Sequence, residues 1–382
     1  MALKVSTRGQ IPPFIVMDVM RAAAERAASG ADVLHLEVGQ PSTPAPAGVI
    51  AAAERALRGD ILGYTDALGI PALRESIALH YRERYGIAVE PRRVVVTTGS
   101  SGAFLLSFLA AFDAGDRVGL ASPAYPAYRN ILKALDLVPV ELEATVAERY
   151  QATVELVRRS PVRLDGLIVA SPANPTGTML RAEELAAIAR HCESSGIRLV
   201  SDEIYHGISY GPGEATALAT SQSAIVVNSF SKYFSMTGWR LGWMVVPPGL
   251  LRAVECLAQN FFISPPALSQ HAALAAFDCR EELDRNVARY RENRDLLLAE
   301  LPNAGFDRLA PADGAFYLYA DVAHLTNDSE DFCRRMLRDI GVAVTPGIDF
   351  DPGRGRGTLR ISFAGSTATM EEAARRLKSW RR

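Results

Sequence analysis

The chain has few cysteines, and their placement excludes two kinds of protein. Its 382 residues include only Cys192, Cys256, Cys279 and Cys333, which are widely spaced and form no C-x-x-C pair. A disulfide-stapled scaffold and a cysteine-rich zinc site are therefore not expected. The pattern instead favours buried free thiols in a reducing compartment, and no metal site is predicted.

Long apolar runs and an excess of one charge are also missing. No run of about 18 apolar residues occurs, and the first ten residues lack the apolar core of a signal peptide. The 41 basic and 43 acidic residues give a net charge of -2. That balance gives no electrostatic reason to expect binding to nucleic acid or to a membrane. A cytoplasmic enzyme is the simplest class.

Short β-rich runs alternate with helix-length segments. The runs cover residues 93–98, 117–120, 166–169, 198–201 and 224–227, and they are nearly continuous in apolar residues. Such strands with helical connections indicate an α/β fold with a mostly parallel sheet that helices cover on both faces. Ligands of such sheets bind at the C-terminal ends of the strands.

The pattern changes after a long charged helical segment that begins at Arg280. Beyond Pro302 the elements become short and mixed, with expected strands at 315–319 and 358–362. We therefore expect a large domain over residues 46–279. A smaller α+β domain is expected from residues 1–45 and 280–382.

Polar residues follow the first and third of these strands. Ser100 and Ser101 lie in T-G-S-S-G, where backbone N–H groups at a helix start would favour a phosphate. A glycine turn with a serine cap explains that segment equally well. Asn174 lies in A-N-P-T-G, and the following proline favours an extended conformation that can aim its amide into a cleft. An ordinary Asn-Pro turn is the alternative.

Two further groups follow the fourth and fifth strands. Asp202 lies at the end of a buried strand, where burying a carboxylate costs free energy unless a cation pairs with it. A protonated pyridine nitrogen would be such a partner, and a helix N-cap is the alternative role. Tyr205 could hydrogen-bond a phenolic oxygen of a cofactor or a structural partner. Lys232 lies in S-F-S-K-Y-F-S-M-T-G-W-R, with Arg240 eight residues later. A lysine placed in this way can hold an aldehyde cofactor as a Schiff base while the arginine binds a phosphate.

Taken in this order, the motifs resemble those of class I/II aminotransferases, which are fold type I enzymes dependent on pyridoxal 5′-phosphate. The resemblance runs from Leu36 to Ser362 and is strongest to the bacterial aspartate aminotransferase subgroup. It implies a mostly parallel seven-stranded sheet in the large domain. It also implies that Lys232 forms the Schiff base and that Asp202 pairs with the pyridine nitrogen.

The resemblance assigns roles to further residues. Asn174 and Tyr205 would contact the ring oxygen, and Tyr125 would stack on the ring, with Tyr128 as the alternative. Arg360, Gly39 and Asn174 would bind the substrate, with Arg360 gripping its carboxylate. Tyr64, and in the same way Ser264, would reach the phosphate of a neighbouring subunit, which implies a homodimer with shared sites. The implied phosphate cup consists of Ser100, Ser101, Ser229 and Arg240.

The implied reaction is ping-pong transfer of an α-amino group from an L-amino acid to a 2-keto acid. Ser101 and Asn260 occupy positions where dicarboxylate-specific relatives carry a cation, so a strict dicarboxylate preference is not expected. Four phenylalanines suggest an apolar or broad side-chain pocket, although phenylalanine is usually a core residue; they are Phe14, Phe261, Phe262 and Phe316. One alternative is a C–S lyase that keeps Lys232, Asp202 and Arg240 but catalyses β-elimination. A non-enzymatic regulator is a weaker alternative, and a nicotinamide dehydrogenase is unsupported because no G-x-G-x-x-G follows a strand.

Overall fold

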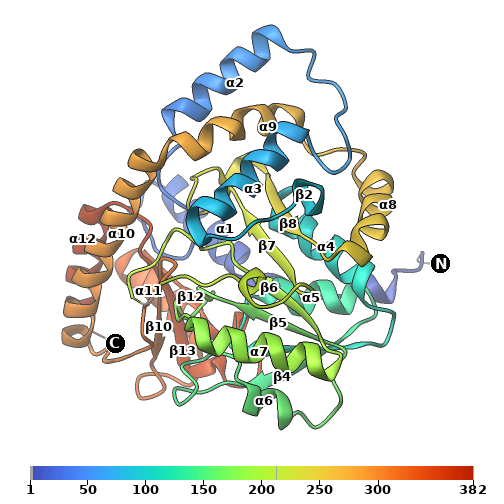
Figure 1. The fold of residues 1–382 in the computed structure, drawn as a ribbon. Helices are drawn as coiled ribbons and strands as arrows, with labels where there is room; N and C mark the ends of the chain where they lie inside the picture. The colour runs from blue at the N-terminus through green and yellow to red at the C-terminus, as the bar shows by residue number, and fades with distance from the viewer. Residues whose placement is uncertain (1–2, 212, 382) are drawn as a thin grey trace.

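The structure is a computed structural model that describes residues 3–211 and 213–381. Its centre is a seven-stranded sheet in the order β2-β8-β7-β6-β5-β3-β4 (Figure 1). The pairs β3–β4, β3–β5, β5–β6 and β6–β7 are parallel. The predicted α/β fold with a mostly parallel seven-stranded sheet is therefore confirmed. The strands of this sheet are β2 (Val94–Thr97), β3 (Arg117–Ser122), β4 (Val138–Glu143), β5 (Gly166–Ala170), β6 (Arg198–Asp202), β7 (Ile225–Ser229) and β8 (Gly242–Val245).

One strand departs from the parallel arrangement. β8 runs antiparallel to both of its neighbours, β2 and β7. Because two reversals cancel, β2 runs in the same direction as β7, and its C-terminal end lies at the same edge of the sheet. The residues of β2, β7 and β8 are all buried, which explains their nearly unbroken apolar sequences.

Helices cover this sheet, and α3, α4, α5 and α7 each pack against one or more of its strands. None of the described helices combines the length and apolarity that crossing a membrane requires. The helices are α1 (Ile15–Ala28), α2 (Ala47–Gly59), α3 (Pro71–Tyr85), α4 (Gly99–Ala111), α5 (Pro126–Ala134), α6 (Val154–Arg158), α7 (Ala182–Ser195), α8 (Leu251–Phe261), α9 (Ala267–Ala273), α10 (Arg280–Glu300), α11 (Ser329–Ile340) and α12 (Thr367–Ser379).

The C-terminal part of the chain builds a second, smaller unit. Its antiparallel sheet has the order β12-β13-β10-β9, and α10 and α12 pack together beside it (Figure 1). The N-terminal segment joins this unit, because β1 pairs with β11 in parallel. The domain limits at residues 46–279 stay a prediction. The strands of this part are β1 (Leu34–His35), β9 (Arg308–Leu309), β10 (Tyr317–Asp321), β11 (Val342–Ala343), β12 (Thr345–Pro346) and β13 (Thr358–Ser362).

Candidate functional site

The C-terminal ends of the central strands meet at a cavity of about 660 Å³. Helix α1, the 38–40 segment and the C-terminal unit close it from the other side. Twelve residues that were candidates from the sequence line it together: Phe14, Gly39, Ser100, Ser101, Tyr125, Tyr128, Asn174, Asp202, Tyr205, Lys232, Arg240 and Arg360. The convergence of parallel strand ends thus brings together side chains that lie far apart along the chain.

Lys232 follows β7 and is half-buried in this cavity. Its Nζ donates a hydrogen bond to the carbonyl oxygen of Gly39 at 2.7 Å and lies 5.7 Å from the ring centre of Tyr205. Burial, helped by the cations of Arg360 and Arg240, lowers the pKa of the amine to about 8. About a tenth of the amine is therefore neutral at pH 7, far more than for an exposed lysine, and the neutral form is the one that attacks carbonyl carbons and accepts protons.

Asp202 is the last residue of β6, and its carboxylate is buried. Burial raises the pKa of this group to about 6, although hydrogen bonds from the hydroxyl of Tyr128 and the amide of Ile204 oppose the rise. Glu203, a second buried carboxylate, adds to the rise. A cationic ring nitrogen facing Asp202 would relieve this cost by pairing with the charge.

An anion-binding corner lies where α4 begins. Its first residue, Gly99, has a φ of +72°, and a Cβ there would lie 2.5 Å from Nη2 of Arg240. Glycine therefore allows the guanidinium to approach the helix start closely. The first amides of α4 lack partners within the helix, so Ser100, Ser101 and Arg240 together form a donor set suited to a phosphate.

Three residues predicted to bind the cofactor phosphate lie outside the cavity lining. Ser229 is buried, and its hydroxyl lies within hydrogen-bond distance of Leu241 O (3.2 Å) and Ser231 Oγ (2.9 Å). Ser231 lines the cavity in its place. Tyr64 is 85% exposed, and neither it nor Ser264 belongs to the lining. Their predicted contact with a neighbouring subunit stays a prediction.

Arg360, on β13, lies opposite the strand ends. Its Nη1 donates to Oδ1 of Asn174 at 2.9 Å, and its Nη2 donates to Thr345 Oγ1 at 3.1 Å and to the carbonyl oxygen of Glu37. The rings of Tyr317 and Phe350 pack on the guanidinium, with centres 4.5 Å and 4.8 Å away. The side chain is therefore held in one orientation before any carboxylate binds.

Tyr317 is a site residue that the sequence pattern did not reveal. Its hydroxyl is 2.6 Å from that of Tyr205. It also fixes the identity of Gly39, since a Cβ at residue 39 would lie 1.9 Å from the Tyr317 hydroxyl. The strand at 315–319 was predicted, but strand alternation alone does not show whether Phe316 or Tyr317 faces the cavity.

The apolar wall of the cavity differs from the one suggested by the phenylalanines. Phe14 lines the cavity, whereas Phe261 and Phe262 do not, and Phe316 is buried in the core. Residues of the first helix and the 38–40 segment add apolar lining: Val16, Met17, Met20 and Val38. Methionines in a helix are usually core residues, so no sequence pattern indicated that Met17 and Met20 face a cavity.

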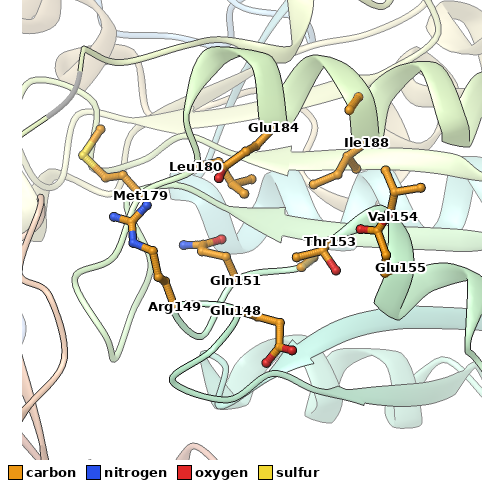
Figure 2. A pocket seen from close by; sticks show the side chains of 12 residues that line it. Glu148, Arg149, Gln151, Thr153, Val154, Glu155, Met179, Leu180, Glu184 and Ile188 are labelled. Carbon is orange, nitrogen blue, oxygen red and sulfur yellow. The ribbon is translucent and has the colours of Figure 1, made fainter.

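A second cavity, of about 270 Å³, lies between the 148–155 segment and α7. Figure 2 shows the side chains of Gln151, Thr153 and Glu184 around it. It shares no lining residue with the larger cavity and contains none of the residues predicted for catalysis or binding. The candidate site is therefore the larger cavity.

Known proteins resemble this chain over nearly its whole length. The profile of the family Aminotransferase class I and II matches residues 31–377. A valine–pyruvate aminotransferase of Mycobacterium tuberculosis is 56% identical, over 99% of this chain and 98% of that protein. An aspartate/prephenate aminotransferase of Thermus thermophilus is 34% identical, over 95% of each chain.

Solved structures agree with these relatives. The crystal structure of an aminotransferase from Mycobacterium tuberculosis has a TM-score of 0.98 at 56% identity and covers 99% of each chain. The Thermus thermophilus aspartate aminotransferase with maleate has a TM-score of 0.93 at 32% identity, again over 99% of each chain. Because the family profile spans residues 31–377 and relatives of 34% and 56% identity match over nearly their whole length, the chain belongs to the aminotransferase class I and II family and is an aminotransferase.

Proposed function

We propose that this aminotransferase binds pyridoxal 5′-phosphate and moves the α-amino group of an L-amino acid with a small apolar side chain, such as valine, to a 2-keto acid such as pyruvate. One observation carries the proposal. A half-buried amine of lowered pKa, a buried carboxylate and a fixed guanidinium line the same cavity, from Lys232, Asp202 and Arg360.

The residues present fit this cofactor. Asp202 is a buried carboxylate with two donated hydrogen bonds and no paired cation within salt-bridge distance among the described residues, which suits a protonated pyridine nitrogen. The close approach of Gly99 and Arg240 suits a phosphate. The other residues that would hold the group are Ser100, Ser101 and Ser231 at the phosphate, Tyr125 at the ring face, and Asn174 and Tyr205 at the ring oxygen.

When bound, pyridoxal phosphate supplies an aldehyde carbon for the amino group and a ring that accepts the electrons of the substrate Cα–H bond. Lys232 supplies the base. Its Nζ, neutral in about a tenth of molecules at pH 7, would take the proton from the substrate Cα and deliver it to the carbon that the cofactor aldehyde supplies. The Gly39 carbonyl, 2.7 Å away, holds this amine in place.

Arg360 orients the substrate for that proton transfer. Its guanidinium faces the cavity beside Asn174, and a substrate carboxylate can take a two-point grip from its fork. The rings on either side of it limit rotation, so the substrate Cα is presented in one position. Holding a reactant in this way removes much of the entropic barrier.

The side-chain preference rests on the charges and apolar surface of the cavity. Its described basic lining residues are Lys232, Arg240 and Arg360, and each already has a role, so none is left to pair with a distal carboxylate. Apolar side chains from α1 face the remaining space. The valine–pyruvate aminotransferase at 56% identity supports the same preference.

The test is a set of half-reactions with the purified, cofactor-loaded protein. Valine, leucine, alanine and aspartate are added singly, and the cofactor absorbance and the released keto acid are followed. We expect a faster spectral change with valine than with aspartate, and return of the first spectrum on adding pyruvate. Faster reaction with aspartate would contradict the substrate class. Release of pyruvate and ammonia from cystathionine without a keto-acid acceptor would indicate elimination instead. No spectral change with any amino acid would refute the function.

We also propose a homodimer with shared sites. Tyr64 and its neighbour Ile61, which is 98% exposed, follow α2, and Leu57 at the end of that helix is 60% exposed. Exposed apolar residues that gather in one segment of the chain are a feature of protein interfaces and support this proposal. Light scattering during gel filtration tests this, and a fully active monomer would contradict it.

A cytoplasmic location is proposed on the state of the cysteines. All four are free thiols, and Cys192 and Cys333 are buried. Free thiols persist in a reducing compartment. Cell fractionation with an antibody against the chain tests this, and recovery outside the cytoplasm would contradict it.

A further inference from the structure

Helix α1 begins without a capping side chain of its own. Phe14 occupies the cap position and offers no hydrogen-bonding side chain. Asp349, far away in the sequence, takes that role: its Oδ1 accepts from the amide of Ile15 at 3.1 Å and its Oδ2 from the amide of Val16 at 3.2 Å. A carboxylate at this end also interacts favourably with the helix dipole.

Asp349 is itself fixed to the large domain. Its side chain is buried, and Nη2 of Arg129 donates to its carbonyl oxygen at 2.9 Å. Nη1 of the same arginine donates to the carbonyl oxygen of Phe350 at 3.0 Å. Arg129 is a buried residue of α5, the helix that follows Tyr125. The carboxylate therefore sets the position of α1 relative to the cavity.

The start of α1 faces that cavity. Phe14, Val16, Met17 and Met20 line it, and the ring of Phe14 meets the edge of Tyr125 with centres 5.7 Å apart. Within the helix, the buried residues are Val16 and Ala23. Because so little of the helix is buried, its first turn depends more on the cap than a core helix would.

Phe350, the residue after Asp349, supports the arginine that would bind the carboxylate end of a substrate. Phe350 packs on the guanidinium of Arg360, with the ring centre 4.8 Å away. Two consecutive residues thus support two separate parts of the cavity. Asp349 supports the apolar wall, and Phe350 supports the carboxylate-binding arginine.

Building on the proposed function, we propose that Asp349 is a positioning residue for substrate choice: by fixing the first turn of α1, it holds the apolar wall against the substrate side chain. Asp349→Asn removes the charge and one of the two acceptors while keeping the size of the side chain. The wall then loses its fixed position, and a substrate side chain that reaches it loses contact. An amino acid too short to reach the wall is affected less.

The experiment compares valine and alanine half-reactions in wild-type holoenzyme, Asp349→Asn and Asp18→Asn. Asp18 lies in the same first turn but is exposed and pairs with Arg21, so it is the matched control. We expect Asp349→Asn to raise KM for valine about fivefold, in line with the loss of one cap, and KM for alanine less than about twofold, with kcat nearly unchanged. Asp349→Ala shows the same pattern more strongly, and Asp18→Asn behaves as wild type.

Hydrogen exchange in the 15–20 segment is the second readout, and it needs no activity. We expect faster exchange there in Asp349→Asn and wild-type exchange in Asp18→Asn. Unchanged exchange in Asp349→Asn overturns the proposal, as does an unchanged ratio of valine to alanine KM. Equal losses of kcat with both amino acids also overturn it, since they indicate general damage. If the wild-type enzyme reacts with no amino acid, the proposed function fails instead. The hydrogen-exchange measurement still shows whether Asp349 stabilises the first turn of α1.

Discussion

Replacing Lys232 with methionine is expected to abolish transamination and to stabilise the cofactor-free protein near neutral pH. Burial and two nearby arginines lower the pKa of this amine from 10.5 to about 8, so folding disfavours its protonated form. At about 1.4 kcal/mol per pH unit, the penalty is at most a little over 3 kcal/mol. Solvent access to the half-buried side chain reduces it, and methionine loses the hydrogen bond to Gly39, worth about 1 kcal/mol. A net gain of about 1–2 kcal/mol remains.

The assay is thermal unfolding of the cofactor-free protein as a function of pH. Between the folded pKa of about 8 and the unfolded value of 10.5, the unfolded wild type binds more protons, so its stability rises with pH. The advantage of Lys232→Met should therefore be complete below about pH 8, a few degrees in Tm, and should vanish towards pH 10.5. Lys133→Met, at an exposed position, is the control and should show no such dependence. A gain that persists at pH 10.5, or a loss of stability at pH 7, would refute the reasoning.

Three further outcomes are expected. Arg360→Lys keeps the charge but loses the planar fork, so KM for every amino acid should rise about tenfold in steady-state assays, and an unchanged KM would exclude the carboxylate role. Gly39→Ala places a Cβ 1.9 Å from the Tyr317 hydroxyl and should lower kcat/KM about 100-fold. Adding Tyr317→Phe removes that hydroxyl and should restore part of the lost kcat/KM, and no recovery would argue against this clash. Tyr128→Phe removes a hydrogen-bond donor that stabilises ionised Asp202, so the pKa of that carboxyl group should rise above about 6. The acid limb of the kcat/KM profile should then move to higher pH, and movement to lower pH would contradict this.

Much of the site was predictable because the geometry of parallel sheets is regular. Ser100, Asn174 and Lys232 each follow a strand and Asp202 ends one, and strand ends that point the same way meet at one edge. The sequence therefore indicated which side chains would meet. It did not indicate the order of the strands, so the antiparallel insertion of β8 was not anticipated.

The parts that could not be predicted depend on where a side chain points or on distant contacts. Ser229 and Ser231 are two residues apart at the end of β7, and which hydroxyl reaches the cavity depends on how the strand ends. Tyr317 faces the cavity from a strand of the smaller unit. No local sequence pattern indicates that this strand lies beside the cavity. The cap that Asp349 provides to Ile15 joins opposite ends of the chain, and no periodicity reveals such a pair.

The pairing of the 34–36 segment with residues 343 and 362 also sets the timing of activity during synthesis. Leu36 donates its amide to Ala343 and accepts from the amide of Ser362, so the 36–39 segment has its final partners only after residue 362 exists. At about 5–20 residues per second, a ribosome needs on the order of ten seconds to proceed from Lys232 to that point. During this interval the reactive amine is already made, but the arginine at 360 is not. A nascent or prematurely released chain that lacks residue 362 is therefore expected to be catalytically silent.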